Sequence, residues 1–338
     1  MQNAKNVGAD LCVCPLKNTE DRRNNKIMGW GQCVLLFQLA THNSQLATHL
    51  CLLALLFLPT IIFAEQNPDA GQPGYFLKLA TGADILAMGG AGVACPDSGI
   101  FINSAGIAIN KGKNLQISSI ALPFPDTSYN LLSYTQRVGT NWGIGFGLPV
   151  LKITGAEKRT SEYDKSSGTF DDQHMALGLG VARRFASGLS FGLTLKAMQQ
   201  KFDEKTIQSS DADVGMIYQH RSDHPISMGI SIQNILGSTI KQVVGIDKMP
   251  RTIMAGVSYS PVNRAFLTVE MQKVNGQALR TCLGGEYSPI KPLSLRAGYD
   301  EQGCMTAGMG LQLKNIALDY GLQNHRYKLS VSSTLNCR

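Results

Sequence analysis

Glycines that alternate with apolar residues are the feature of this sequence that most resembles a binding motif. They occur in Gly143-x-Gly145-x-Gly147, Gly178-x-Gly180 and Gly308-x-Gly310. A phosphate-binding loop places such glycines between a strand and a helix, so that the helix N-terminus faces the phosphate. In this chain the flanking residues continue the same apolar alternation. We therefore interpret these glycines as one face of β-strands, and nucleotide chemistry is not expected.

Cysteine and histidine residues lack the spacing of a metal site or of a nucleophile with its base. Of the 8 cysteines, Cys95, Cys282, Cys304 and Cys337 follow residue 64, and none of them belongs to a C-x-x-C pair. In an exported protein, Cys282 and Cys304 are candidates for a disulfide, with buried free thiols as the alternative. Since no acid and base are paired in the sequence, we predict no enzyme, no metal and no cofactor.

Isolated charges inside alternating segments are the remaining candidates for chemistry. They occupy the positions between large apolar residues: Arg184, Lys196, Glu270, Arg280, Glu286, Arg296 and Asp319. If the apolar residues face lipid, these charges face a lumen, where each must be paired or hydrated. They either form ion pairs that hold an N-terminal segment, with Arg296 or Arg280 facing Asp84 or Asp97, or line a path that guides a ligand.

The elements that must position these charges are strands, because apolar residues recur at every second position. In Trp142 to Leu148, the large apolar side chains share one face and glycines share the other. An apolar face opposed by small residues fits a wall with lipid outside and a crowded lumen inside. The pattern therefore predicts an all-β fold, a transmembrane antiparallel β-barrel, with a soluble sandwich or propeller as the alternative. About fourteen such segments occur, at residues 115–117, 132–134, 142–148, 175–181, 189–195, 214–218, 226–232, 253–259, 267–271, 279–287, 293–299, 305–313, 316–322 and 327–331.

The connections between these segments alternate in length, as in outer-membrane barrels with short periplasmic turns and long outer loops. Short turns include Gly139-Thr140 and Lys314-Asn315, whereas the long connections are residues 154–170, 203–210 and 237–249. An even number of strands then places both ends of the barrel at the periplasmic side.

The N-terminal region does not alternate. Residues 50–64 form an apolar run that suits the core of a signal peptide and is shorter than the roughly 20 residues of a spanning helix. We therefore expect residues 1–64 to be an export signal with an upstream extension, cleaved near Ala64, with a retained anchor as the alternative. Residues 65–110 are small and glycine-rich, which indicates a hatch inside the lumen, and residues 111–338 are the barrel. The formal charge of +7 is too scattered to indicate nucleic acid.

A signature in the hatch connects the chain to a known family. Its members are Gly82, Ala83, Met88, Gly89, Gly90, Ala91, Asp97, Asn103, Ala105 and Gly106. In these residues, and in shorter matches along residues 75–338, the chain resembles the PorV/PorQ family of outer-membrane proteins, which is related to the FadL-type fatty-acid transporters. Two positions depart from the family pattern, because Ser104 replaces a proline and the chain ends in Cys337-Arg338 instead of an aromatic residue. The resemblance implies a fourteen-stranded barrel with an N-terminal hatch.

The resemblance also implies a function, an accessory role in protein secretion. A PorV-like barrel would receive type IX-like cargo or pass it to surface-attachment machinery, with secretion components and cargo proteins as partners. The alternative is a FadL-like transporter of hydrophobic small molecules, with Phe101, Ile102, Phe124 and Leu148 lining its pocket. A purely structural outer-membrane protein is a third interpretation. In each case we expect an integral protein in the outer membrane of a diderm bacterium, in contact with lipid and not with nucleic acid.

Overall fold

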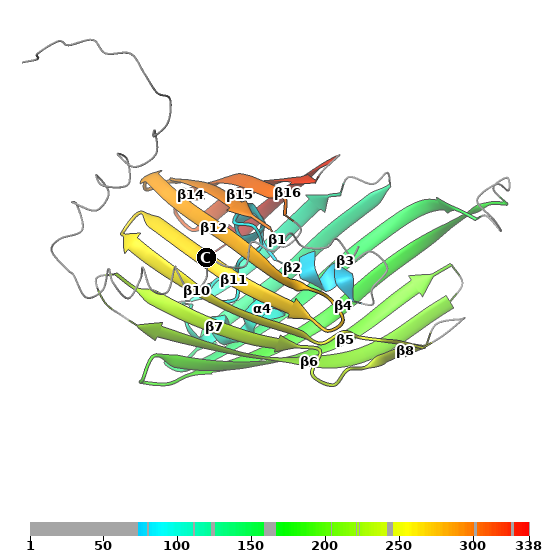
Figure 1. Ribbon diagram of the computed structural model, residues 1–338, viewed down its shortest axis with the longest axis horizontal. Coiled ribbons are helices and arrows are strands. Elements are labelled where there is room, and N and C mark those ends of the chain that lie inside the picture. The colour runs from blue at the N-terminus through cyan, green and yellow to red at the C-terminus, as the bar shows by residue number, and fades with distance from the viewer. Residues whose placement is uncertain are drawn as a thin grey trace, which may run out of the picture. The chain divides into compact units, whose positions relative to one another are not determined.

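The described part of the chain is a β-barrel with its N-terminal segment inside (Figure 1). The computed structural model describes residues 74–79, 81–110, 112–122, 126–158, 167–203, 205–220, 222, 224–241, 246–300, 303–325 and 328–337. The predicted export signal and cleavage site lie outside these residues, as does Phe124. The domain limits at residues 65–110 and 111–338 stay predictions.

Fourteen antiparallel strands form the closed wall, and β1 pairs with β16 to complete it. The fourteen-stranded antiparallel barrel expected from the alternation is confirmed, and every described residue of the fourteen segments lies within one of these strands. The wall comprises β1 (Lys113–Ala121), β2 (Thr127–Val138), β3 (Trp142–Glu157), β4 (Thr169–Arg184), β5 (Leu189–Phe202), β6 (Lys205–His220), β7 (Ile226–Gln233), β10 (Thr252–Val262), β11 (Ala265–Val274), β12 (Leu279–Ile290), β13 (Leu293–Tyr299), β14 (Met305–Leu313), β15 (Ile316–His325) and β16 (Lys328–Cys337).

Several strands continue into segments that the sequence indicated as loops. β3 extends to Glu157, and β6 begins at Lys205, so that β5 and β6 are joined by a tight connection. A separate hairpin of β8 (Thr239–Lys241) and β9 (Ile246–Lys248) forms within the connection of residues 237–249. The two-residue apolar period that predicts a membrane strand is not sustained in these segments, which is why the sequence indicated loops there.

The two faces of the wall differ as the sequence indicated. Large apolar side chains such as Trp142, Leu179 and Leu195 are exposed on the outside, whereas the alternate positions of the same strands are buried. Such a continuous apolar outer surface fits lipid, because a protein surrounded by water seldom exposes so large an apolar area. The described helices are short, and none of them has the length and apolar character needed to cross a membrane.

The hatch consists of short helical turns inside the wall. They are η2 (Tyr75–Leu79), α3 (Ala83–Ala87), α4 (Ile100–Asn103) and η3 (Ser104–Ala108). Helix α3 packs against β13, β14, β15 and β16, and η3 packs against the wall from β2 to β6. The hatch therefore spans the lumen from one side of the barrel to the other.

Inward-facing glycines let the hatch backbone approach the wall closely. A side chain at Gly192 of β5 would collide with the backbone of Ala105, one at Gly229 of β7 with Val93, and one at Gly284 of β12 with Met88. Similar contacts occur at Gly143 (β3), Gly298 (β13) and Gly321 (β15). The glycines between apolar residues thus form a ring around the hatch. They occupy these positions because a larger side chain would collide with the hatch.

Candidate functional site

Wall side chains form hydrogen bonds with backbone groups of the hatch. The helical turns of the hatch are too short to pair these groups within the turn. The Glu270 carboxylate accepts hydrogen bonds from the backbone N–H groups of Gly92, at 2.9 Å, and Val93, at 2.8 Å. Thr194 and Thr306 donate to the carbonyls of Ile100 and Ala87, at 3.0 and 2.9 Å. Because unsatisfied backbone groups are costly away from water, these residues hold the hatch in one position.

Asn103 of the hatch signature binds hatch and wall at once. Its side-chain amide donates to the Val93 carbonyl at 2.7 Å and to the carbonyls of Met216 and Ile230 on β6 and β7 at 3.2 and 3.3 Å. Its side-chain oxygen accepts from the Ala105 backbone at 3.2 Å. A side chain larger than glycine at Gly215 would occupy the space of this amide. Asn103 therefore links the hatch to two neighbouring wall strands by hydrogen bonds.

The other signature residues lie along the same contact. Gly89 and Gly90 have φ angles of +72° and +78°, and Gly89 packs on the Tyr299 backbone of β13. Backbone groups of Ala83 and Ala91 bond to Thr334 and Thr268 of the wall. Asp97 differs, because its side chain is exposed and lines a cavity. The remaining signature positions, Gly82, Met88, Ala105 and Gly106, are buried within the hatch or against the wall.

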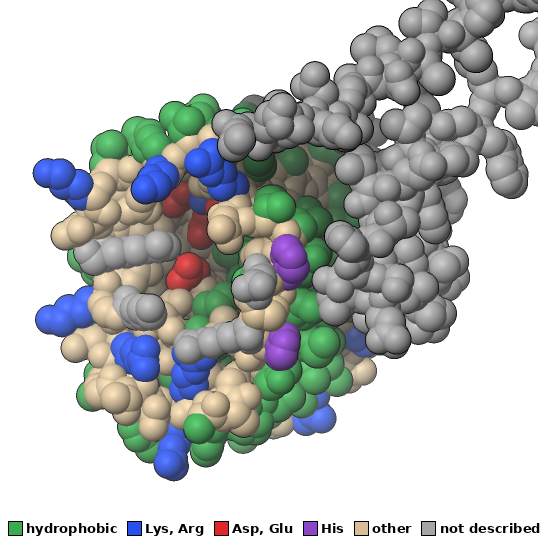
Figure 2. All heavy atoms as spheres, turned by 90° about the vertical axis from the view of Figure 1, so that its left-hand side faces the viewer, with side chains coloured by type: hydrophobic (Ala, Val, Ile, Leu, Met, Phe, Trp, Pro, Cys, Tyr) green, Lys and Arg blue, Asp and Glu red, His purple; other side chains and the backbone are tan. Residues whose placement is uncertain are grey.

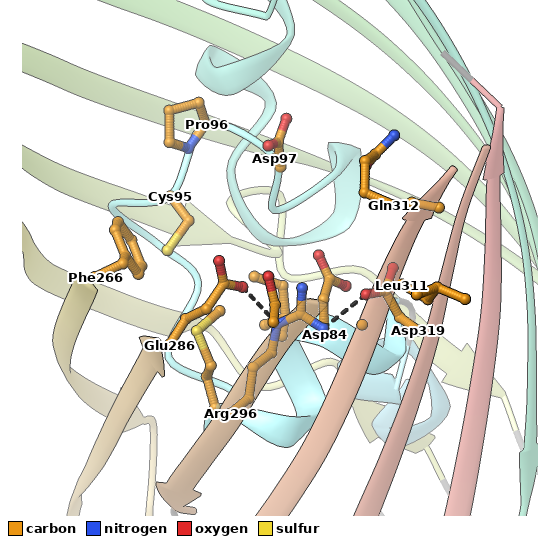
Figure 3. Close-up of a pocket in the computed structure, with 15 residues that line it drawn as sticks. Asp84, Cys95, Pro96, Asp97, Phe266, Glu286, Arg296, Leu311, Gln312 and Asp319 are labelled. Carbon is orange, nitrogen blue, oxygen red and sulfur yellow. Dashed lines mark hydrogen bonds and ion pairs between the residues drawn. The ribbon is translucent and has the colours of Figure 1, made fainter. Parts of the chain in front are cut away.

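An ion cluster centred on Arg296 lies where α3 meets the wall. The guanidinium of Arg296 (β13) pairs with Glu286 (β12) and Asp319 (β15), each at 2.6 Å. Asn336 of β16 donates to the same Asp319 carboxylate at 3.3 Å. Asp84 of the hatch faces this guanidinium in Figure 3 and acts on it electrostatically. The sequence suggested that Arg296 or Arg280 pairs with Asp84 or Asp97 of the hatch, whereas the ion pairs of Arg296 with Glu286 and Asp319 join wall strand to wall strand.

A polar cavity of about 250 Å³ lies beside this cluster. The hatch contributes Asp84, Met88 and Asp97, and the wall contributes Glu286, Arg296 and Asp319. Figure 2 views the barrel from the end with the short turns, where carboxylates lie in the hollow and Lys and Arg surround the rim. Carboxylates therefore outnumber cations in this cavity. Within the described residues, no group of three or more His, Cys, Asp and Glu is arranged to hold a metal ion.

Asp84, one of the two hatch carboxylates that line this cavity, should make the stability of the barrel depend on pH. Burial raises the pKa of Asp84 from 3.8 to about 6, with Asp319 adding to the rise and Arg296 opposing it. The unfolded chain ionises Asp84 at lower pH than the folded chain does. The folded barrel therefore loses stability as the pH rises through this interval, by about 3 kcal/mol in total for Asp84. Asp84→Asn should remove this loss, so that its free energy of unfolding at neutral pH exceeds that of the wild type.

Unfolding measured in lipid vesicles on both sides of this interval tests the prediction. Asp97→Asn is the matched control, because Asp97 is an exposed hatch carboxylate that lines the same cavity. An Asp84→Asn variant with the same pH dependence as the wild type would show that Asp84 does not carry the loss.

The other lumen-facing charges have structural partners. Lys196 pairs with Asp213 at 2.7 Å and donates to Asn234 at 2.7 Å. The Asp211 carboxylate accepts from the backbone of Leu236 and Ser238, at 3.0 Å each, and so fixes the connection that follows β7. Arg184 and Arg280 are also buried and face inward, and Arg184 donates to Gln219 at 3.4 Å. Arg184 and Arg280 thus lie on the buried faces of β4 and β12.

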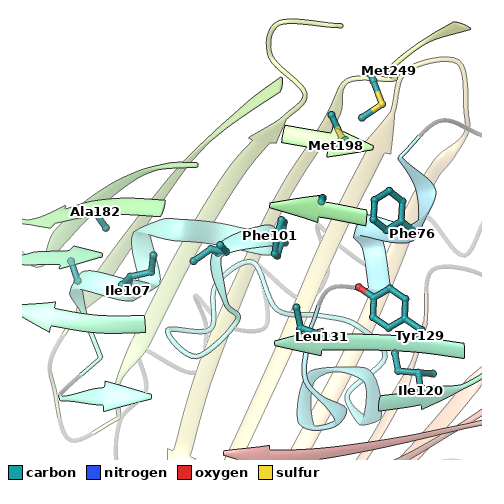
Figure 4. Close-up of a cluster of buried hydrophobic side chains, with 12 residues drawn as sticks. Phe76, Phe101, Ile107, Ile120, Tyr129, Leu131, Ala182, Met198 and Met249 are labelled. Atoms are coloured by element: carbon teal, nitrogen blue, oxygen red, sulfur yellow. The ribbon is translucent and has the colours of Figure 1, made fainter. Parts of the chain in front are cut away.

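An apolar cluster fills the lumen towards the end with the long connections (Figure 4). Phe76 of η2 belongs to this cluster, and its ring centre lies 5.5 Å from that of His174 on β4. The wall contributes Tyr129 and Leu131, which are 0% and 2% exposed. Within the part of the chain that the structure describes, the buried Tyr129 hydroxyl has no hydrogen-bond partner. We call this set, Phe76, Phe101, Ile120, Tyr129, Leu131, Met198 and Met249, the apolar cluster.

The sequence identified one member of the apolar cluster, Phe101. Ile102, proposed with it, packs instead against Ile85, Met88 and Cys95, and Leu148 lies in the outward register of β3. The other members were missed because buried apolar residues of β2 and β5 do not differ in type from those that face lipid. Cys282 and Cys304 are buried and are not joined by a disulfide, so the candidate disulfide is absent.

These features define a class, a fourteen-stranded barrel of the outer-membrane type whose N-terminal hatch closes its own lumen. Neither a protein-family model nor a curated protein sequence matches the chain. Solved structures do match it in fold. The Ralstonia pickettii toluene transporter TbuX is 14% identical with a TM-score of 0.55, and the match covers 76% of this chain and 98% of that one.

Two further structures extend the likeness. The Pseudomonas putida toluene transporter TodX is 12% identical, with a TM-score of 0.54 and coverage of 75% of this chain and 96% of that one. A Pseudomonas aeruginosa FadL homologue is 8% identical, with a TM-score of 0.52 and coverage of 76% and 97%. At these identities the likeness establishes the fold, and this chain has the FadL-like barrel fold.

Proposed function

We propose that this chain is an outer-membrane channel through which a hydrophobic small molecule passes by way of the hatch. The observation that carries the proposal is the apolar cluster, which is enclosed by the wall at the end of the lumen with the long connections. A lumen that conducts ions or sugars is polar and hydrated, whereas a pocket for an apolar ligand is lined by aliphatic and aromatic side chains. The structures similar in fold include two toluene transporters.

Phe76 and the η2 turn occupy the position that such a ligand would take. Phe76 is buried against His174 and the apolar cluster, and a cavity of about 20 Å³ beside η2 is too small for a ligand. In the proposed cycle, a ligand displaces η2 and replaces its apolar contacts with its own. Movement of the rest of the hatch then opens the way to the polar cavity and the short-turn end.

A matched pair of substitutions on β2 tests this proposal. Leu131 lies in the apolar cluster and is 2% exposed, whereas its neighbour Leu132 faces outward and is 37% exposed. Uptake of radiolabelled naphthalene, decane and decanoate would be measured in diderm cells that express each variant, with sucrose as the polar control. We expect the wild type and Leu132→Gln to raise uptake of at least one apolar compound, and Leu131→Gln to reduce that uptake several-fold. Equal uptake by both variants, with folded barrels in the membrane, would contradict the proposal.

A second candidate is the accessory role in secretion that the resemblance to PorV/PorQ suggested. The observation in its favour is the close fit between the inward glycines and the hatch backbone, which suits a barrel that stays shut while its outer loops bind protein. Under this candidate, affinity capture from the native outer membrane recovers secretion components or cargo proteins, and no apolar compound is taken up.

A further inference from the structure

Arg183 lies on the outer surface of β4, at the end of the barrel with the short turns. Its neighbours across the strands are Trp142 on β3 and Phe191 on β5. The centre of its guanidinium lies 5.2 Å from the centre of the Trp142 ring and 5.1 Å from that of Phe185. Phe185 in turn contacts Phe191 edge to face at 5.9 Å. Arg183 is thus held by aromatic rings and not by a carboxylate.

The hydrogen-bonding edge of this guanidinium has no partner in the described part of the chain. None of the described ion pairs or hydrogen bonds involves the Arg183 side chain. Its outward neighbours Trp142, Val181 and Phe191 are all apolar and exposed. A guanidinium carries five N–H donors in a planar fork that matches the oxygens of a phosphate, and stacking on aromatic faces leaves that edge open.

The position of Arg183 along the strand corresponds to the edge of the apolar band. The outward positions between Arg183 and Gln173 include Leu177, Leu179 and Val181, all exposed and apolar. At about 3.3 Å per residue and a tilt of roughly 40°, the distance between Arg183 and Gln173 along the membrane normal is about 25 Å. That is the height of the lipid-facing band of outer-membrane barrels, so Arg183 lies at the level of the headgroups.

We propose that Arg183, stacked between Trp142 and Phe185, binds the phosphate of an anionic phospholipid in the leaflet at the short-turn end. The proposal rests on the membrane placement proposed above and not on the passage of a ligand through the lumen. Arg264, Lys291 and Lys314 are exposed at the same rim, which Lys and Arg side chains surround in Figure 2. This excess of positive charge favours a headgroup with net negative charge over a zwitterionic one.

Trp142 provides a direct probe of this site. The chain has 2 tryptophans, Trp30 and Trp142, so that in a Trp30→Phe background Trp142 is the sole emitter. The full-length protein is reconstituted into phosphatidylcholine vesicles with increasing fractions of phosphatidylglycerol brominated near the headgroup. Quenching of Trp142 then gives the binding constant of phosphatidylglycerol relative to phosphatidylcholine at this position. Arg183→Gln is compared with Arg264→Gln, which removes an exposed arginine at the same rim.

We expect the wild type and Arg264→Gln to prefer phosphatidylglycerol about fivefold, the effect of one interfacial arginine, and Arg183→Gln to lose this preference. A relative constant near unity in the wild type would overturn the proposal, and so would an unchanged preference in Arg183→Gln. A change in Trp142 emission on adding inorganic phosphate to the detergent-solubilised protein, without any lipid preference, would assign the site to free phosphate instead. Because the readout is lipid contact, a barrel that transports nothing still returns a clear result.

Discussion

Arg296→Met should lower the free energy of unfolding of the barrel by about 3–5 kcal/mol, which is the usual cost of removing one partner of a buried ion pair. Arg296 is the cation of the cluster, and its two ion pairs tie β12, β13 and β15 together. Its removal leaves the carboxylates of Glu286, Asp319 and Asp84 without the cation that balances them. The loss should be larger above pH 6 than below it, because the pKa of Asp84 is raised to about 6 and its charge adds to the cluster only above that pH.

Denaturant unfolding in lipid vesicles, followed by tryptophan fluorescence, measures this loss. Arg264→Met is the control, because Arg264 is exposed at a turn and donates to the Pro289 carbonyl. The triple variant Arg296→Met, Glu286→Gln, Asp319→Asn should recover much of the stability, since neutral amides do not repel one another. A loss below about 1 kcal/mol for Arg296→Met, comparable to an exposed pair, would show that the cluster does not stabilise the barrel.

Gly284→Val should displace the hatch while the wall remains closed. The new side chain would meet the backbone and side chain of Met88, and overpacking of this kind costs about 1–3 kcal/mol when the structure can shift. The wall strand tolerates valine well, because β-branched residues suit strands. We expect the collision to be relieved by movement of the hatch, since the hatch is held by fewer bonds than the strand.

Conductance in planar bilayers and protease digestion of the hatch measure this displacement. Gly285→Val is the matched control on the same strand, because a side chain at Gly285 meets the flexible end of Leu267 on the outside. We expect Gly284→Val to conduct ions and to expose the hatch to protease, and Gly285→Val to behave as the wild type. A conductance as low as the wild type's, with a protected hatch, would refute the account of the glycine ring.

The wall was predictable from the sequence because each strand carries its own signal. Trp142, Ile144 and Phe146 face lipid whatever the hatch does, and lipid accepts only apolar side chains over the height of the membrane. The inward register of Arg184, Lys196 and Asp319 follows from the same alternation, since a side chain one position along a strand lies on the opposite face. These inferences require only local periodicity.

The partners of the inward residues were not predictable. The sequence placed Arg296 in the lumen and suggested Asp84 or Asp97 of the hatch as its partner, but it did not identify Glu286 on the neighbouring strand or Asp319 two strands away. Strand register and hatch position together decide that Glu286 and Asp319 lie at 2.6 Å from the guanidinium. The role of Glu270 in binding the backbone of Gly92 and Val93 carries no sequence signal of its own.

The sequence by itself determined the number of strands, the face each one turns to lipid and the presence of a non-alternating hatch, because these depend on residue types within a few positions of one another. The tertiary structure alone decided which glycine receives which part of the hatch, which carboxylates share Arg296, and which apolar residues join Phe76 inside the lumen. Most of those contacts join residues far apart in the sequence, although Glu286 and Arg296 face each other within one hairpin, and closure of the barrel around the hatch fixes their geometry.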